Sequence, residues 1–112
     1  METTRQQKVA RLLQKDLSEI IQLHGKDITQ DKLVTVTVVR MSPDLSFAKV
    51  YLSIFPSDKP DEFLEKWNVH VKHLRLELGK KVRHQLRIVP EIAFYIDDSM
   101  DYAEHIDSLL NS

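Results

Sequence analysis

The sequence contains no cysteine, only two glycines and no long apolar run. Without cysteine, the chain cannot form disulfides, thiolate zinc sites or a cysteine nucleophile. No segment approaches the roughly 18 consecutive apolar residues that a membrane-spanning helix needs, so no membrane partner is expected. The first seven residues lack an apolar core and do not have the pattern of a signal peptide. Together these absences favour a cytoplasmic protein.

The 112 residues are enough for one domain with a substantial core, and their charge is unevenly distributed. From residue 97 onward the chain holds five acids and no lysine or arginine, whereas residues 1–96 carry 16 basic and 12 acidic side chains, a formal charge of +4. A basic body with an acidic tail favours a polyanionic partner. An ordinary domain with a solubilising tail would show the same balance, so charge alone leaves both readings open.

Residues 3–25 have the pattern of an amphipathic helix. Thr3 and Thr4 are followed three residues later by Gln6 and Gln7, which is a capping-box arrangement. Apolar residues then recur at helical spacing, and Gly25 is a natural stop because glycine adopts a left-handed conformation at little cost.

Two strands joined by a tight turn are predicted next. Residues 34–38, VTVTV, are all β-branched and alternate with period two. Residues 41–45 include Pro43 and Asp44, which favour a turn. Residues 47–55 alternate again, so the pair should form a hairpin.

A helix is predicted from about residue 60 to residue 85, with a break. Its apolar face comprises Trp67, Val71, Leu74, Leu78 and Val82. Unbroken, the helix would be about 39 Å long, which is too long for a domain with a radius of gyration of about 13 Å. We expect the break at residues 68–71 or at Gly79, although a glycine inside a helix can instead mark close packing on a sheet.

Residues 86–96 are predicted to form a third strand, with Pro90 restricted to an edge, a strand start or a bulge. Ile88, Ile92, Phe94 and Ile96 share one parity and should face the core. Because a strand that returns through a helix is usually parallel to the neighbour it joins, we expect an α+β fold. Its three-stranded sheet would have helices packed on one face. The other face would show Thr35, Thr37, Lys49, Tyr51, Ser53, Ala93 and Tyr95, either as a solvated surface or as a contact surface.

Two segments carry a resemblance to a known family. The first is residues 41–51, MSPDLSFAKVY, and the second combines residues 74–80, LRLELGK, with residues 86–94, LRIVPEIAF. Both are similar to signatures of the bacterial ribosome-binding factor A family, and the Val-x-x-Leu-Leu-x-x-x-Leu pattern from Val9 also fits. The resemblance covers roughly residues 6–99.

The resemblance implies a type II KH-like fold, α-β-β-α(kink)α-β, over residues 1–98, followed by an acidic C-terminal tail, residues 99–112. It also implies a non-catalytic assembly factor that needs no cofactor and acts on no small-molecule substrate. Such a factor binds the immature 30S small ribosomal subunit and promotes late 16S rRNA maturation, including 5′ end processing. We expect a monomer.

The chain departs from the family pattern in two places. The family kinks its long helix at an Ala-x-Gly step, where this chain has His70, Val71 and Lys72, and His84-Gln85 resembles a two-residue lengthening before the last strand. The two glycines are also too far apart to form the GXXG loop with which ordinary KH modules clamp nucleotides. Binding should therefore rest on phosphates met by basic side chains.

The candidate RNA-binding residues are basic and cluster in the second half of the chain. They are Lys72, Arg75, Lys80, Lys81, Arg83, His84 and Arg87, with a second contribution from Lys8, Arg11 and Lys15. Any one of them could equally be a solvated surface charge. The clustering is the stronger signal.

Metal binding and catalysis have weaker support in the sequence than RNA binding has. His70, His73 and Glu77 share one side of a helix, but a usual zinc site needs more ligands, and surface histidines are the simpler interpretation. No catalytic arrangement stands out, so we expect neither an enzyme nor a metal site. The alternative function is a protein-interaction module that uses the exposed sheet face around Tyr51 and Tyr95.

Overall fold

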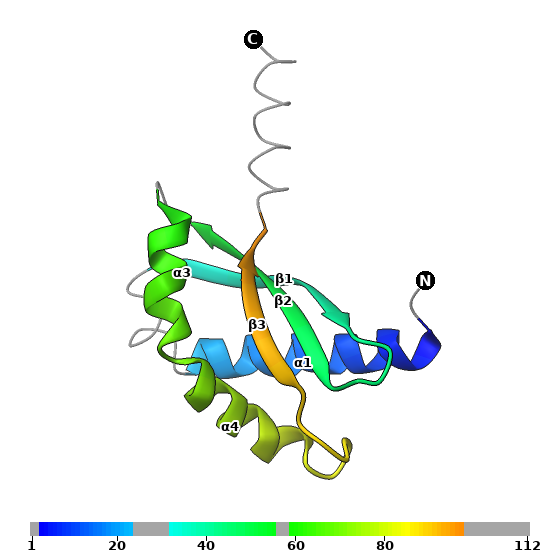
Figure 1. The fold of residues 1–112 in the computed structure, drawn as a ribbon. Helices are drawn as coiled ribbons and strands as arrows, with labels where there is room; N and C mark the ends of the chain where they lie inside the picture. The colour runs from blue at the N-terminus through cyan, green and yellow to red at the C-terminus, as the bar shows by residue number, and fades with distance from the viewer. Residues whose placement is uncertain (1–2, 24–31, 56–58, 98–112) are drawn as a thin grey trace.

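The computed structural model describes residues 3–23, 32–55 and 59–97 of the chain. The elements in these ranges follow the order α1, β1, β2, α3, α4, β3, which confirms the predicted order of helix, two strands, broken helix and strand (Figure 1). The predicted helix stop at Gly25 and the predicted tail of residues 99–112 lie outside the described residues.

Helix α1, Thr4–Leu23, begins with the predicted capping box. The Gln6 backbone N–H donates to Thr3 Oγ1 at 3.2 Å, and the Thr3 N–H donates to Gln6 Oε1 at 2.7 Å. The Gln6 side-chain amide also donates to the Met41 carbonyl at 3.0 Å, which ties the start of the helix to the end of the first strand. The apolar face of α1 is buried, as its spacing predicts.

Strands β1 (Leu33–Met41) and β2 (Phe47–Phe55) form the predicted antiparallel hairpin. In the turn, Asp44 Oδ1 accepts hydrogen bonds from the hydroxyls of Ser42 (2.8 Å) and Ser46 (2.7 Å) and from the Ser46 N–H (3.1 Å). These bonds, those from Ser46 first, lower the pKa of Asp44 from 3.8 to about 2.

A β-bulge at Thr37 interrupts the predicted alternation of β1. Val36 and Val38 pair with consecutive residues of β2, so Thr37 is the extra residue. Beyond it, Val39 is buried and Arg40 is exposed on the outer face. Unbroken alternation would have carried Arg40 onto the core face with Val36, where an unpaired charge is costly to bury.

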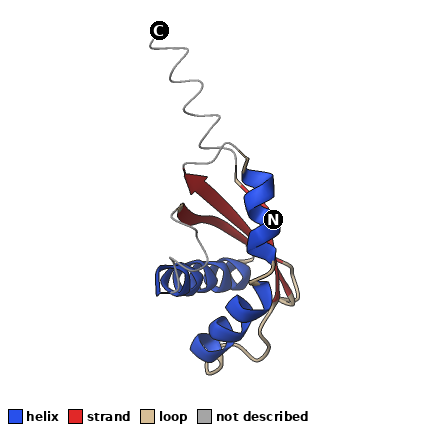
Figure 2. Cartoon of the chain, turned by 90° about the vertical axis from the view of Figure 1, so that its left-hand side faces the viewer, coloured by secondary structure: helices blue, strands red, loops and turns tan. Residues whose placement is uncertain are grey.

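The long helix is broken at Val69 and His70, within the predicted residues 68–71, and divides into α3 (Pro60–Asn68) and α4 (Val71–Val82). The change of direction is visible in Figures 1 and 2. Of the three residues predicted at the kink, His70 lies in the break, with φ −94° and ψ 0°, whereas Val71 and Lys72 open α4.

The break allows both helices to bury their apolar sides. Trp67 packs edge-on against Phe94 of the last strand, with ring centroids 5.6 Å apart, and lies beside Phe63. Gly79 is not a second break. A Cβ at Gly79 would lie 3.3 Å from Val89 Cγ2, so this glycine marks close packing, here on the segment that precedes the last strand.

Strand β3, Glu91–Ile96, is shorter than predicted, since residues 86–90 are not part of it. Helix α4 ends in a turn in which the Gln85 and Leu86 N–H groups both donate to the Val82 carbonyl. Pro90 has no N–H to pair, so the ladder starts only after it. The prediction that Ile88 faces the core is wrong, because 71% of this residue is exposed.

The sheet order is β1-β2-β3, with β3 parallel to β2 as predicted. Three cross-strand rows face the helices: Met41–Ala48–Ile92, Val39–Val50–Phe94 and Val36–Leu52–Ile96. Apart from half-buried Ile96, these side chains form one core with the buried side chains of α1, α3 and α4, so the helices pack on one face of the sheet. This confirms the predicted α+β architecture.

Candidate nucleic-acid interface

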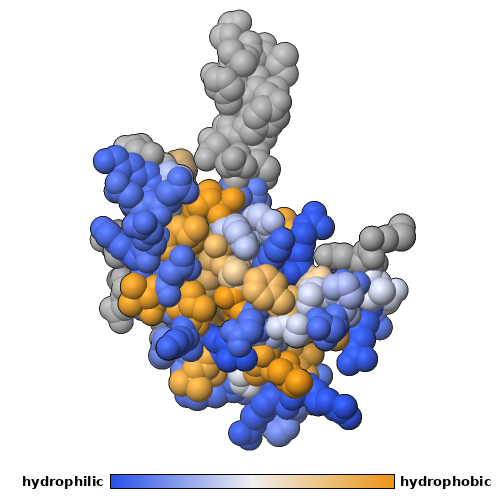
Figure 3. Space-filling model, viewed as in Figure 1, coloured by the Kyte–Doolittle hydropathy of each residue, from blue (hydrophilic) through white to orange (hydrophobic). Residues whose placement is uncertain are grey.

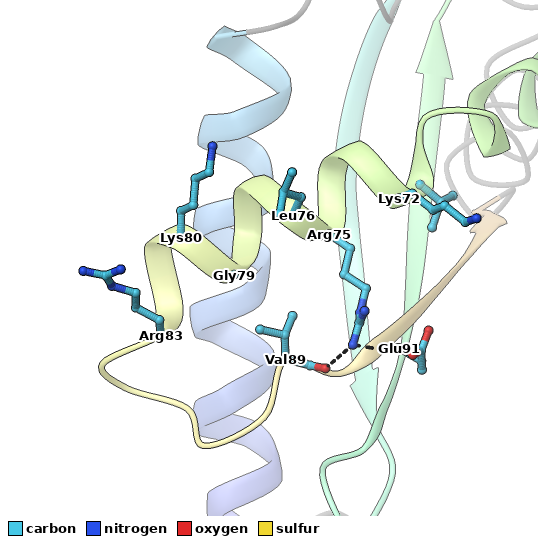
Figure 4. Close-up of a pocket in the computed structure, with 9 residues that line it drawn as sticks. Lys72, Arg75, Leu76, Gly79, Lys80, Arg83, Val89 and Glu91 are labelled. Atoms are coloured by element: carbon cyan, nitrogen blue, oxygen red, sulfur yellow. Dashed lines mark hydrogen bonds and ion pairs between the residues drawn. The ribbon is translucent and has the colours of Figure 1, made fainter.

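A groove of about 750 Å³ lies between α4 and the segment that leads into β3 (Figure 4). Basic and apolar side chains share its lining, which comprises Val71, Lys72, Arg75, Leu76, Gly79, Lys80, Arg83, Val89 and Glu91. Because Gly79 has no side chain, Val89 approaches the helix backbone closely at this point. Four of the predicted cations line this one concave surface: Lys72, Arg75, Lys80 and Arg83.

Lys72, Lys80 and Arg83 are the exposed cations of the groove, and Figure 4 shows their side chains extending from α4. Lys80 Nζ lies 3.2 Å from Glu77 Oε1, one turn earlier on the helix. An exposed pair of this kind contributes only about 0.3–0.5 kcal/mol, so Lys80 can exchange it for a phosphate at little cost. Arg83 Nε donates to His84 Nε2 at 3.2 Å, which brings the predicted His84 beside the groove.

Arg75 is held differently from the other groove cations. Its Nε donates to the Pro90 carbonyl at 3.0 Å, and its Nη2 donates to the Val89 carbonyl at 2.8 Å. Glu91 Oε1 lies 3.5 Å from the same Nη2. The guanidinium thus joins α4 to the start of β3 and forms one wall of the groove.

Lys81 points away from the groove toward α1. Its Nζ lies 2.8 Å from Glu19 Oε2, and Asp16 adds a further negative charge nearby. The hydrogen bond raises the pKa of Lys81 and lowers that of Glu19. Lys81 therefore links two helices and does not join the groove cations.

The remaining predicted cations lie apart from the groove. Arg87 lines a smaller cavity of about 190 Å³ together with Arg5 and Asp44, beside the hairpin turn. A separate exposed row runs along α1 and consists of Lys8, Arg11 and Lys15. The candidate RNA-binding residues are thus divided among the groove, the α1–α4 contact, the hairpin end and α1.

The outer face of the sheet is mixed in character. Tyr51 and Tyr95 are neighbours there, with ring centroids 5.6 Å apart. In Figure 1 helix α1 lies behind the strands, and the same view in Figure 3 shows hydrophilic and hydrophobic residues intermixed over the molecule. On the predicted contact surface Tyr95 and Lys49 are exposed and Tyr51 is half-buried, and exposed Arg40 is an addition to it.

Sequence reasoning missed several of the groove and sheet-face residues. Leu76 is 61% exposed in the groove, and an apolar residue off the apolar seam of a helix is a signal that could have indicated this. Arg40 was missed because the bulge is not apparent from a pattern of five alternating residues. Val89 and Glu91 were missed because the third strand was predicted to begin too early.

Within the part of the chain that the structure describes, there is neither a cluster of metal ligands nor a membrane-spanning helix. No three His, Asp or Glu side chains there converge as metal ligands do. Nor is any helix in residues 3–23, 32–55 and 59–97 long and apolar enough to cross a membrane.

The fold and the groove identify the structural class of this domain. The order α-β-β-α-α-β, with an antiparallel hairpin and a parallel third strand, is that of a type II KH-like domain, here with a basic groove and no GXXG loop. The sequence then gives the family, since residues 5–110 match the family described as Ribosome-binding factor A. The chain belongs to the ribosome-binding factor A family.

Comparisons with individual relatives support this family assignment. The ribosome-binding factor A of Cytophaga hutchinsonii is 48% identical over 111 residues, which cover 99% of this chain and 84% of that protein. That of Chlorobaculum tepidum is 41% identical, covering 96% of this chain and 89% of the relative. The crystal structure of ribosome-binding factor A from Thermus thermophilus is similar with a TM-score of 0.68 at 25% identity, over 81% of this chain and 94% of that one.

A second Thermus thermophilus comparison concerns a complex. A homology model of that ribosome-binding factor A, fitted into a cryo-EM map of a 30S complex with the factor, is similar with a TM-score of 0.63. Its sequence is 27% identical, and the match covers 80% of this chain and 91% of that one.

Proposed function

We propose that this protein binds the immature 30S ribosomal subunit through 16S rRNA and promotes late maturation of that RNA, including its 5′ end. It acts in the cytoplasm as a monomer, by occupying a site on the subunit, and neither makes nor breaks a covalent bond. Family membership and the 30S complex of the Thermus thermophilus relative support this proposal. The observation that carries it is the groove beside α4, where Lys72, Lys80 and Arg83 present positive charge around exposed Leu76.

The groove suits structured RNA better than a particular base sequence. Lysine and arginine side chains meet phosphates, which fix position on a nucleic acid without reading its sequence. A GXXG loop, the usual clamp for four nucleotides, cannot form from two glycines 54 positions apart. Recognition therefore depends on the shape of the rRNA and on its phosphates. The acidic tail, residues 99–112, is proposed to lie outside the RNA-binding domain.

Cosedimentation with separated ribosomal subunits tests the binding. We expect the protein to travel with small subunits at low salt and to dissociate at about 0.5 M salt, because each phosphate contact releases counterions. Failure to travel with small subunits at low salt, or binding that high salt leaves unchanged, would contradict the proposal.

A matched pair of charge reversals tests the groove. The double variant Lys72→Glu/Arg83→Glu removes two groove cations, whereas Lys59→Glu/Lys66→Glu makes the same change in net charge at the two ends of α3, outside the groove. If both groove cations contact phosphates, the first variant reduces the log–log salt slope of binding by about 1.8, at about 0.9 per contact, and the second leaves it unchanged. Equal losses in the two variants would mean that only net charge matters.

The maturation step needs a separate measurement. In cells depleted of their own factor, we expect the wild-type chain and the α3 control variant to restore the mature 16S 5′ end, mapped by primer extension, and the groove variant to fail. Purified protein incubated with precursor rRNA alone should leave the RNA intact. Cleavage in that reaction would show that the protein is an enzyme.

A further inference from the structure

The outer face of the sheet places two tyrosines beside two cations. Tyr51 and Tyr95 are register partners on β2 and β3, with ring centroids 5.6 Å apart and planes inclined at 31°. Two residues along β2, Lys49 is the register partner of Arg40 on β1, and both are exposed. We call these four residues the tyrosine patch. Its two rows are about 6.8 Å apart along the strand, a distance that one nucleotide can bridge.

The two cations lie directly opposite each other on adjacent strands. The bulge at Thr37 is what turns Arg40 onto this face, opposite Lys49. A phosphate placed here would be within reach of both exposed side chains.

The same face also carries two acids. Glu91 lies 3.5 Å from Arg75 at the groove side of β3, and Asp97 accepts a hydrogen bond from the Thr37 hydroxyl. Asp97 lies four residues beyond Ala93, the register partner of Lys49, so this acid and the two cations are at opposite ends of the face.

We propose that the tyrosine patch binds single-stranded RNA. One base stacks on Tyr95, which is 41% exposed and supported from the side by Tyr51, and the adjoining phosphates meet Arg40 and Lys49. Aromatic side chains on a sheet hold unpaired bases by stacking, and stacking is tolerant of base identity. The choice of RNA as the polyanion rests on the proposed function, but the surface is distinct from the groove, which lies beside α4.

Binding of unstructured RNA to the full-length protein tests the patch. The probes are a fluorescently labelled oligouridine and a labelled RNA duplex, followed by anisotropy. Tyr95→Ala should weaken oligouridine binding about 5- to 30-fold, because one stacked base is lost, and should leave duplex binding unchanged. Tyr95→Phe keeps the ring and should bind oligouridine nearly as well as wild type.

The charge component has its own measurement. Lys49→Gln should lower the log–log salt slope for oligouridine by about 0.7, the value for one phosphate contact on a single strand. Lys66→Gln removes an exposed cation from α3, away from the sheet face, and should leave the slope unchanged. Both variants alter exposed side chains, so their folding is checked simply by melting temperature.

Several outcomes would overturn the inference. Oligouridine binding that Tyr95→Ala leaves unchanged would exclude stacking on this face. A concentration-dependent dimer that Tyr95→Ala abolishes would assign the face to a second copy of the chain, and loss of a protein partner with oligouridine binding intact would assign it to a protein. The proposed function fails separately, if Lys72→Glu/Arg83→Glu retains full binding to small subunits while the protein remains folded.

Discussion

Replacing Arg75 by lysine separates two roles that this side chain can have. Lysine keeps the positive charge that a phosphate would need, but it lacks the planar group with which arginine contacts two acceptors at once. In the structure those acceptors are the carbonyls of Val89 and Pro90, at 2.8 and 3.0 Å. If Arg75 acts as a clamp between α4 and β3, the substitution reduces stability more than it reduces RNA binding.

The expected loss follows from the two hydrogen bonds. A bond that involves a charged group contributes about 1.5–3 kcal/mol when buried. The Arg75 side chain is 37% exposed, so we take about 1 kcal/mol for each bond. Lysine can retain one of them, so Arg75→Lys should lower the free energy of unfolding by about 1 kcal/mol, and Arg75→Met, which loses both, by about 2 kcal/mol.

Urea unfolding measures this loss directly. Trp67 is the only tryptophan and packs against Phe94 of β3, so its fluorescence reports separation of the helices from the third strand. Binding to small subunits is measured in parallel, with Lys72→Gln as the matched comparison. Lys72 lines the same groove, is exposed and should lose affinity with no change in stability.

One pattern of results would refute the reasoning. If Arg75→Lys unfolds at the wild-type urea midpoint and loses as much subunit affinity as Lys72→Gln, then Arg75 is a phosphate ligand and not a clamp. The opposite pattern, lower stability with affinity nearly retained at low urea, supports the clamp.

Two further predictions concern ionised groups whose pKa the fold shifts. Asp44 has its pKa lowered from 3.8 to about 2 by hydrogen bonds from the turn, so its contribution to stability is present above pH 3.8 and is lost as the pH falls through about 2. Thermal melts of Asp44→Asn should therefore show a lower melting temperature than wild type at neutral pH and a smaller difference near pH 2; a constant difference would contradict this. The Glu19–Lys81 bond lowers the first pKa from 4.5 and raises the second from 10.5, so its contribution is complete between these values and declines in acid or strong base. Lys81→Gln should accordingly reduce the pH dependence of stability that Glu19 confers, measured in a double-mutant cycle, and should weaken small-subunit binding less than Lys72→Gln does.

Much of the fold could be predicted because its signals are local. The capping box of Thr3 and Gln6, the apolar spacing of α1 and the turn at Asp44 each depend on residues a few positions apart. The break near His70 could also be predicted, since a single straight helix would not fit within a domain of this size. The family signatures lie in these same local segments.

The candidate site could be predicted only in part. Positive charge along residues 72–83 is apparent from the sequence, and three of its cations do share the groove as exposed side chains. Which partner each cation meets is a long-range matter: Lys81 pairs with a residue 62 positions away, and Arg75 with carbonyls 14 and 15 positions away. The sequence pattern treats these side chains as equivalent, whereas the packing of α4 against α1 and β3 distinguishes them.

Sequence alone thus determined the helices, the hairpin and the sign of the charge, because periodicity and turn chemistry act within a few residues. Tertiary structure decided where β3 begins, how the bulge at Thr37 turns Arg40 outward, and which cations remain exposed. These features depend on contacts between backbone and side-chain groups that are far apart in the sequence, and such contacts form only when the chain folds.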